Sequence, residues 1–281
     1  MTKEASWAGV RDRLVNGELD MAHVLYGLMY GVHGGGASRS PRRQSRQPGL
    51  ATIPTMGTLY LVRHGQASFG ADNYDQLSAL GQRQCQRLGE YFARRGRRFD
   101  AVITGTLERQ KQSLAAITLG LGEQAQTRPE PLRLPGLNEY DSHAVIAAIH
   151  PAPLARPDTP ELYRHHFRLL RDGLSAWMAG QTQPVGMPSY VDFSAGVAAA
   201  LALVRERYAG DVLMVSSGGP ISTTVGQVLG TSAVATIELN MRIRNSAVTE
   251  LAFTPKRHTL LTFNTLPHLD DEALADWVTY A

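Results

Sequence analysis

The sequence predicts an α/β protein, a three-layer sandwich whose mostly parallel central sheet carries helices on both faces and one small helical insert. Short apolar runs alternate along the chain with segments of helical periodicity, which is typical of parallel sheets. The chain has 281 residues, 43% of them hydrophobic, enough to bury a sizeable core. Charged residues make up 19%, so the composition excludes a wholly disordered protein.

The first predicted elements follow residue 56. The run from Thr58 to Val62 predicts a strand that ends at Arg63-His64-Gly65. Helical periodicity then covers 77–95 and 107–119, with a β-rich run at 99–104 between them. Sheet and helix therefore alternate from the start of the folded part.

The later elements repeat this order. They are a helix at 160–179, a helix at 190–208, a strand at 211–216 and an antiparallel pair at 246–253 and 258–263. The first of these helices belongs to an insert over about 140–190. Pro220 suits the first position of a helix after the strand.

Residues 1–55 are expected to be an N-terminal extension, and 56–281 the folded domain. Residues 33–50 combine Gly, Ser, Pro and Arg without apolar spacing, as a linker does, and Met56 is a candidate start of the native chain. The extension carries seven basic and four acidic residues, so the net charge of +3 lies there. A basic nucleic-acid-binding body is therefore not expected, and only the tract Arg39–Arg46 could bind nucleic acid.

The chain contains a single cysteine, Cys85, which cannot form an internal disulfide and suits a reducing compartment. Its helical surroundings indicate a buried packing residue, not a nucleophile. No apolar run approaches the roughly 18 residues that cross a bilayer. We therefore expect a cytoplasmic protein that does not bind membranes.

Reactive side chains follow the predicted strands, where ligands bind in open α/β sheets. They are Arg63 and His64 after the first strand, Arg109 after the second, Glu139 after a third short run, and Gly218 and Gly219 after the last long one. Two arginines and a helix N-terminus suit a phosphate dianion. The imidazole of His64 could donate to phosphate or attack phosphorus, and Glu139 could protonate a leaving alcohol.

Five ordered motifs in the chain resemble those of the histidine phosphatase (phosphoglycerate mutase-like) superfamily over about 56–270. The motifs are Leu59 to Ala67, Leu77 to Gly81 with Gln84, Leu107 to Ser113, Leu137 to Glu139, and Val215 to Gly219. The resemblance implies a phosphatase without metal or cofactor that forms a phosphohistidine at His64. It implies that Arg63 and Arg109 hold phosphoryl oxygens and that Glu139 is the general acid and later the base.

The resemblance also implies phosphate contacts from Gln66, Ser217 and Gly218. Ser217 departs from the family pattern, because it stands where the family has a second histidine. A serine is shorter and uncharged, and losing one preorganised donor typically costs on the order of 10²–10³ in rate. Activity is therefore expected to be reduced but not abolished. His143 could take over that role or be an ordinary loop residue.

The favoured function is hydrolysis of a phosphomonoester, on either a phosphorylated small molecule or a phosphoprotein. Ser217 motivates the alternative, a catalytically impaired phospho-ligand-binding or regulatory protein of the same fold. A phosphoglycerate mutase is less favoured, because the insert at 140–190 has no evident basic cluster for a bisphosphate. The sequence leaves the oligomeric state open.

Overall fold

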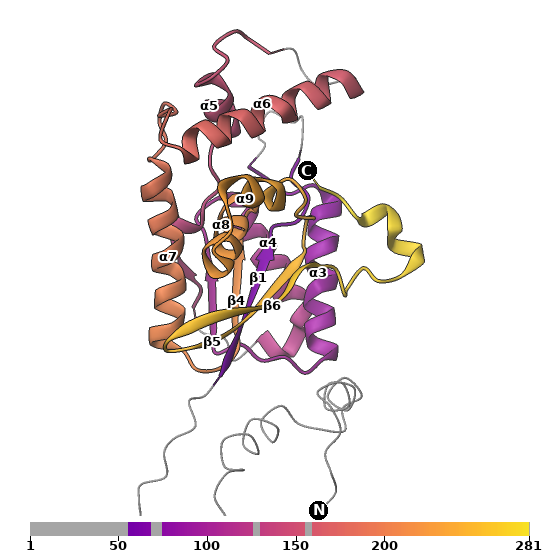
Figure 1. The fold of residues 1–281 in the computed structure, drawn as a ribbon. Coiled ribbons are helices and arrows are strands. Elements are labelled where there is room, and N and C mark those ends of the chain that lie inside the picture. Colours follow the sequence, from indigo (N-terminus) through magenta and orange to yellow (C-terminus); the bar gives the residue numbers. More distant parts are fainter. Residues whose placement is uncertain (1–55, 69–74, 126–129, 155–158, 281) are drawn as a thin grey trace, which may run out of the picture. The chain divides into compact units, whose positions relative to one another are not determined.

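The computed structural model describes residues 56–68, 75–125, 130–154 and 159–280 (Figure 1). The predicted extension 1–55, with the tract Arg39–Arg46, lies outside the described residues. The strands are β1 (Gly57–Arg63), β2 (Ala101–Thr104), β3 (Leu132–Arg133), β4 (Val212–Ser216), β5 (Val248–Thr254) and β6 (Arg257–Thr265).

The helices lie between these strands. The α-helices are α3 (Ala79–Arg94), α4 (Glu108–Leu121), α5 (Ser142–Ala147), α6 (Pro160–Met178), α7 (Tyr190–Arg207), α8 (Gly218–Leu229) and α9 (Ala233–Asn240). Short 3-10 helices are η1 (Gly122–Ala125), η2 (Pro135–Leu137) and η3 (Glu272–Trp277). Within the described ranges, none of the helices combines the length and apolarity that a bilayer crossing needs.

The strands form one sheet in the order β3-β2-β4-β1-β5-β6. The first four of these strands run parallel, while β5 is antiparallel to β1 and β6 is antiparallel to β5. Arg63 at the end of β1 is in register with Ser216, and Thr104 at the end of β2 is in register with Val215. The carboxyl ends of three strands therefore meet at one edge, where ligands bind in such sheets.

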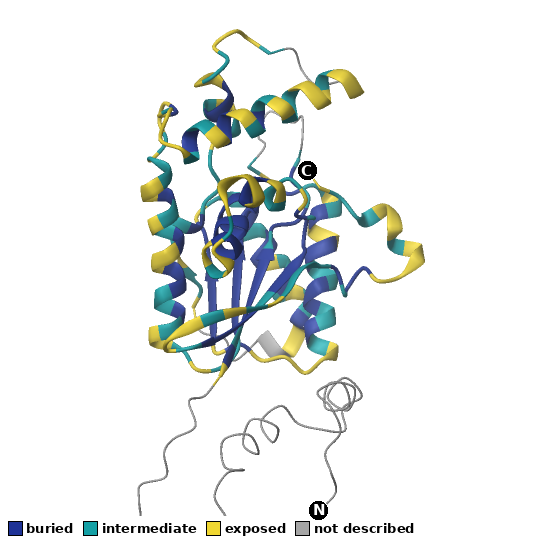
Figure 2. Ribbon diagram, viewed as in Figure 1, coloured by how far each residue is buried: buried dark blue, intermediate teal, exposed yellow. Residues whose placement is uncertain are grey.

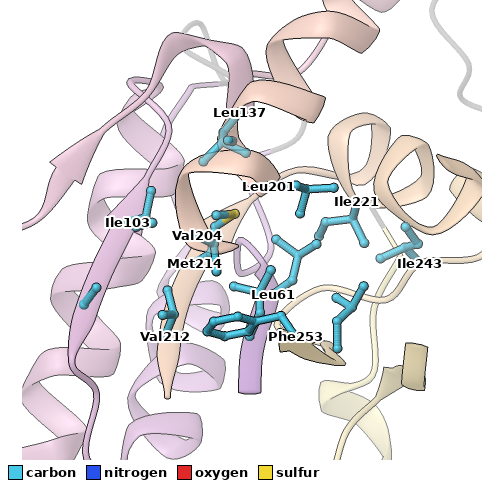
Figure 3. Close-up of a cluster of buried hydrophobic side chains, with 14 residues drawn as sticks. Leu61, Ile103, Leu137, Leu201, Val204, Val212, Met214, Ile221, Ile243 and Phe253 are labelled. Atoms are coloured by element: carbon cyan, nitrogen blue, oxygen red, sulfur yellow. The ribbon is translucent and has the colours of Figure 1, made fainter. Parts of the chain in front are cut away.

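The inner strands β2, β4, β1 and β5 are mostly buried, dark blue in Figure 2, whereas the edge strand β6 is partly exposed. Leu59 and Leu61 of β1 pack on one face, in a cluster that includes Val204 of α7 and Ile221 of α8 (Figure 3). Tyr60 and Val62, which alternate with these leucines along β1, belong to a cluster on the other face, together with residues of α3 and α4. Successive side chains of a strand point to opposite faces, so two-sided burial accounts for the unbroken apolar runs. The α/β class and the sandwich of helices around a mostly parallel sheet are confirmed.

Local signals explain where several helices begin. The side chains of Ser78, Thr159 and Ser189 each accept a backbone hydrogen bond at the start of α3, α6 and α7. Helix α8 begins at Gly218, so the prediction that Pro220 opens it is wrong by two residues. The carbonyl of Ser217 already accepts the N–H of Ile221, at 3.1 Å, and this bond starts the helix directly after β4.

The predicted insert contains α6 and a second, unexpected helix, α5. Its side chains form a separate cluster around Trp177, which is 1% exposed. The Trp177 ring lies 6.0 Å from that of Tyr140 and 5.3 Å from that of Phe193. This aromatic packing joins the insert to the segment that follows β3 and to α7.

Candidate active site

The end of β1 positions Arg63 and His64. The backbone N–H of His64 donates to the carbonyl of Ser216 at 2.9 Å, and its carbonyl accepts from Ser246 at 3.1 Å. The backbone of His64 is therefore held between β4 and the segment before β5. Its side chain is buried, with 2% exposure.

The imidazole of His64 has a defined tautomer. Its Nδ1 lies 2.7 Å from the carbonyl oxygen of Gly65, and because a carbonyl can only accept, Nδ1 carries the proton. Burial, followed by the charges of Arg63 and Arg109, holds the pKa of His64 well below 6.5. At neutral pH the ring is therefore uncharged, and its Nε2 keeps a lone pair available for attack.

The loop after His64 lies directly against α3 and α4. A Cβ atom on Gly65 would overlap the carbonyl oxygen of Gly81, so this close approach requires glycine. The N–H of Gly65 donates to Oγ of Ser113 at 3.0 Å, and that hydroxyl donates to the carbonyl of Arg109 at 2.7 Å. Gly65, whose carbonyl orients the imidazole of His64, is thus hydrogen bonded to α4, the helix that carries Arg109.

The two arginines are held by different partners. Nη1 of Arg109 lies 2.8 Å from Oδ1 of Asp75, and the Arg109 side chain is 8% exposed. Nη1 of Arg63 donates to the carbonyls of Ile243 and Tyr280. These contacts fix both guanidinium groups, which match the geometry of phosphate oxygens.

Glu139 lies at the N-terminus of α8. Its Oε1 accepts the N–H of Gly219 at 2.9 Å and that of Tyr140 at 3.3 Å, and a Cβ atom on Gly219 would overlap Oε1. Burial raises the pKa of Glu139 above 4.5, while the charges of Arg109 and Arg63 oppose this shift in part. Because both arginines act on His64 as well as on Glu139, the four side chains share one site.

Ser217 follows β4 directly and is fully buried. Nε2 of Gln110 donates to its Oγ at 2.8 Å and to the carbonyl of Leu137 at 2.8 Å. Since the Ser217 oxygen accepts this bond, its own hydroxyl proton can be donated elsewhere. The contact with phosphate remains a prediction.

The other predicted site residues differ in position. Gly218 begins α8 beside Glu139. The amide oxygen of Gln66 accepts from Oγ of Ser78 at 2.8 Å, so this end of the side chain is turned toward the start of α3. His143 is 91% exposed on α5 beside Asp141, a position that does not favour a role in the buried site.

Three partners of the site have no signal in the sequence. Asp75 pairs with Arg109, Gln110 with Ser217, and the carbonyl of Tyr280 with Arg63. Each is an ordinary polar group whose partner lies far away in the chain. Within the described ranges, no three His, Cys, Asp or Glu side chains are grouped so that they could hold a metal ion.

Two family models match parts of this chain. The family model of the histidine phosphatase superfamily (branch 1) matches residues 159–266, which include Ser217 and Gly218. A second model, of the NMT1-like family, matches residues 1–106, a range that contains β1, α3 and β2 of the same sheet. No curated protein sequence matches the chain.

Solved structures provide matches over most of the described residues. The α-ribazole phosphatase from Shigella flexneri is 22% identical, with a TM-score of 0.51, over 74% of this chain and 96% of that one. Phosphoglycerate mutase from Bacillus anthracis is 16% identical, with a TM-score of 0.54, over 76% and 96%. Phosphoserine phosphatase from Entamoeba histolytica is 20% identical, with a TM-score of 0.52, over 76% and 99%. The chain therefore has the phosphoglycerate mutase-like fold of these enzymes, and its C-terminal part matches the histidine phosphatase superfamily (branch 1).

Proposed function

We propose that this protein is a phosphatase of the histidine phosphatase superfamily that hydrolyses a phosphomonoester through a phosphohistidine at His64. One observation carries the proposal: the site shifts the pKa of His64 down and that of Glu139 up. At the ordinary values of 6.5 and 4.5, an imidazole is neutral only at a pH where a glutamic acid has lost its proton. The two shifts favour the neutral imidazole and the protonated carboxyl that this reaction needs.

In the first step, Nε2 of His64 attacks phosphorus with its lone pair. The bond from phosphorus to the ester oxygen breaks, and the departing oxygen takes the proton of Glu139 as it becomes an alcohol. The positive charge that develops on the ring is stabilised by the Nδ1–H bond to the carbonyl of Gly65. Arg63 and Arg109 neutralise the phosphoryl oxygens.

In the second step, water attacks the phosphorus of the phosphohistidine. Glu139, now a carboxylate, accepts a proton from this water, and the nitrogen–phosphorus bond breaks with its electrons returning to Nε2. The products are inorganic phosphate and the starting state of the enzyme. The N–H of Gly219 at the N-terminus of α8 donates to Glu139 and stabilises its carboxylate form in this second step.

Ser217 and Gln66 have supporting roles in this proposal. Ser217 accepts from Gln110 and is proposed to donate its hydroxyl proton to a phosphoryl oxygen. As a short, neutral donor it supports a slower reaction than a charged imidazole would allow. Gln66 is proposed to contact phosphate or substrate through its amide nitrogen.

The substrate is proposed to be a phosphorylated small molecule, with a phosphoprotein as the second candidate. Structural neighbours named for phosphoserine and α-ribazole phosphatase activity support the small molecule. The proposal includes a cytoplasmic location, which suits the single Cys85. The competing function, motivated by Ser217, is a protein that binds such ligands without turnover.

The test compares wild type, His64→Ala and His143→Ala on an aryl phosphate. His143→Ala is the matched control, because that histidine is exposed on α5. We expect wild type and His143→Ala to turn over substrate and form an acid-labile phosphoenzyme, and His64→Ala to lose at least about 10³-fold in kcat. Thermal melting checks that each variant folds.

Two results separate the candidate functions. A folded wild type that binds phosphate but shows neither turnover nor phosphoenzyme supports the binding protein. Phosphoenzyme formation by folded His64→Ala contradicts the assignment of the nucleophile.

A further inference from the structure

A second cationic site lies at the other end of the sheet. It is a cavity of about 330 Å³ lined by α7, by the C-terminal end of α8 and by the turn between β5 and β6. The lining residues are Ala198, Leu201, Arg205, Gln227, Val228, Lys256, Arg257 and His258. Its volume falls within the range of small-molecule sites, about 300–1,000 Å³.

The strand register separates this cavity from the candidate active site. Phe253, close to the β5–β6 turn, pairs with Gly57 at the start of β1, whereas His64 follows the end of β1. Seven strand residues at about 3.3 Å each put the two sites roughly 20 Å apart. Figure 1 shows the β5–β6 turn beside the lower end of α7, away from the end of β1 that carries Arg63.

The charges of the cavity are of one sign. Arg205, Lys256 and Arg257 line it, and no carboxylate from the part of the chain that the structure describes does. Lys256 and Arg257 are exposed, so water and salt screen their charges, whereas the charge of half-buried Arg205 is screened less. The lining therefore favours an anion.

Two buried polar atoms in this lining have no hydrogen-bond partner among the described residues. They are Nε of Arg205 and Nε2 of His258. An unsatisfied buried polar atom is costly, and native structures contain few of them. These two nitrogens have almost no accessible surface, so an anion bound in the cavity would interact with Arg205 through the charge of its guanidinium.

The cationic wall of the cavity is held in place before any ligand binds. Nη1 of Arg205 donates to the carbonyl of Lys256 at 3.1 Å, which fixes the guanidinium against the turn. The ring of His258 packs at 5.9 Å from that of Phe253. Burial, followed by the charge of Arg205, lowers the pKa of His258 to about 4, so its ring is neutral at pH 7.

Another part of the cavity wall is apolar. Leu201 is buried and Val228 is half-buried, and both belong to the packing of the main core. A ligand that fits both walls has an anionic head and an apolar body. The planar fork of Arg205 and the charge of Lys256 match a phosphate head.

We propose that this cavity binds a small organic phosphate with an apolar body, at a site separate from the active site. The proposal is independent of catalysis at His64. Helix α8 runs from Gly218 at the active site to Gln227 at the cavity, so its backbone amides report on both sites.

The test titrates phenylphosphonate, which is not hydrolysed, into the full chain and follows backbone amide NMR signals. Gly218 and Gly219 report the active site, and Gln227 and Val228 report the cavity. We expect a saturable shift of Gln227 and Val228, with Kd about tenfold weaker or more in Arg205→Ala. Arg207→Ala is the matched control, because Arg207 is exposed on the same helix and does not line the cavity.

A second variant, Lys256→Ala with Arg257→Ala, changes only exposed side chains and keeps the test valid if Arg205→Ala does not fold. The proposal is overturned if Gln227 and Val228 do not shift, or if both variants bind as wild type does. Equal binding of benzoate or of neutral benzyl alcohol overturns the choice of a phosphate head. Shifts confined to Gly218 and Gly219 support the active site alone, whereas shifts confined to the cavity support this site and count against the proposed phosphatase.

Discussion

The two ends of the central sheet both gather cations, but they pair them differently. At the candidate active site, Arg109 is buried against the carboxylate of Asp75, and Arg63 is held by two backbone carbonyls. At the cavity, Arg205 donates to the carbonyl of Lys256, and among the described residues no carboxylate lines this cavity. Cations that are held by partners keep their geometry before a substrate arrives, which favours catalysis. Cations that no carboxylate neutralises, in an open cavity, favour the binding of an anion.

The largest effect is expected from Glu139→Gln. A glutamine cannot protonate the leaving alcohol, so kcat on an alkyl phosphate should fall by about 10²–10⁴-fold. The second step, in which Glu139 is the proposed base, is common to all substrates, so the comparison uses kcat/KM, which reports the first step. For an aryl phosphate, whose alcohol leaves without protonation, kcat/KM should fall much less than for the alkyl phosphate, and equal losses of kcat/KM on both would show that Glu139 is not the acid.

The pH profile offers an independent check on Glu139. Glu139 acts as an acid only while it is protonated, so wild-type kcat should fall as pH rises through its raised pKa. Because the pKa of His64 is lowered, its imidazole stays neutral at mildly acidic pH, and kcat should not fall there. In Glu139→Gln the decrease of kcat at alkaline pH, the alkaline limb of the profile, should disappear. If this limb persists in the variant, it belongs to another group.

A smaller effect, a gain, is expected from Ser217→His. If a weak neutral donor limits the reaction, an imidazole at this position should raise kcat by about tenfold or more. The new ring has to displace the amide of Gln110, so thermal melting must accompany the kinetics. An unchanged kcat in a folded variant would mean that another group already stabilises the phosphoryl oxygens.

Asp75→Asn tests the pairing of the buried cation directly. Losing the carboxylate beside Arg109 should lower kcat/KM by about tenfold, because the guanidinium is no longer held in place. Asp211→Asn is the matched control at the far end, where Asp211 lies 3.5 Å from an Arg97 side chain that is 46% exposed. That variant should keep its activity and lose less than about 1 kcal/mol of stability, measured by chemical denaturation. Similar activity losses in both variants would contradict the distinction between the two ends.

The sequence could predict which residues end the strands, and the reason is geometric. Apolar runs locate the strands, and the carboxyl ends of parallel strands share one edge, so Arg63, His64 and Arg109 could be grouped in advance. The partners of these groups could not be predicted. Asp75 is 34 positions from Arg109 and Gln110 is 107 positions from Ser217, and nothing in the local pattern marks either pair.

The second cationic site had no sequence signal for a related reason. Arg205 lies in a helix and His258 in a strand, and each is an ordinary polar residue of its element. Only the packing of α7 against the β5–β6 turn leaves their nitrogen atoms buried together. Burial without a partner is a property of the folded chain, and no pattern in the sequence records it.

The reactivity of Cys85 can report on local opening beside the candidate active site. It is the only cysteine, it is fully buried, and burial raises its pKa to about 11, although Ser113 and Gly65 hydrogen bond to it. Since the thiolate is the reactive form, a thiol reagent can modify it only while this region opens. The rate at which the reagent labels Cys85 therefore reports how often the region around Gly65 opens. This measurement needs no substrate.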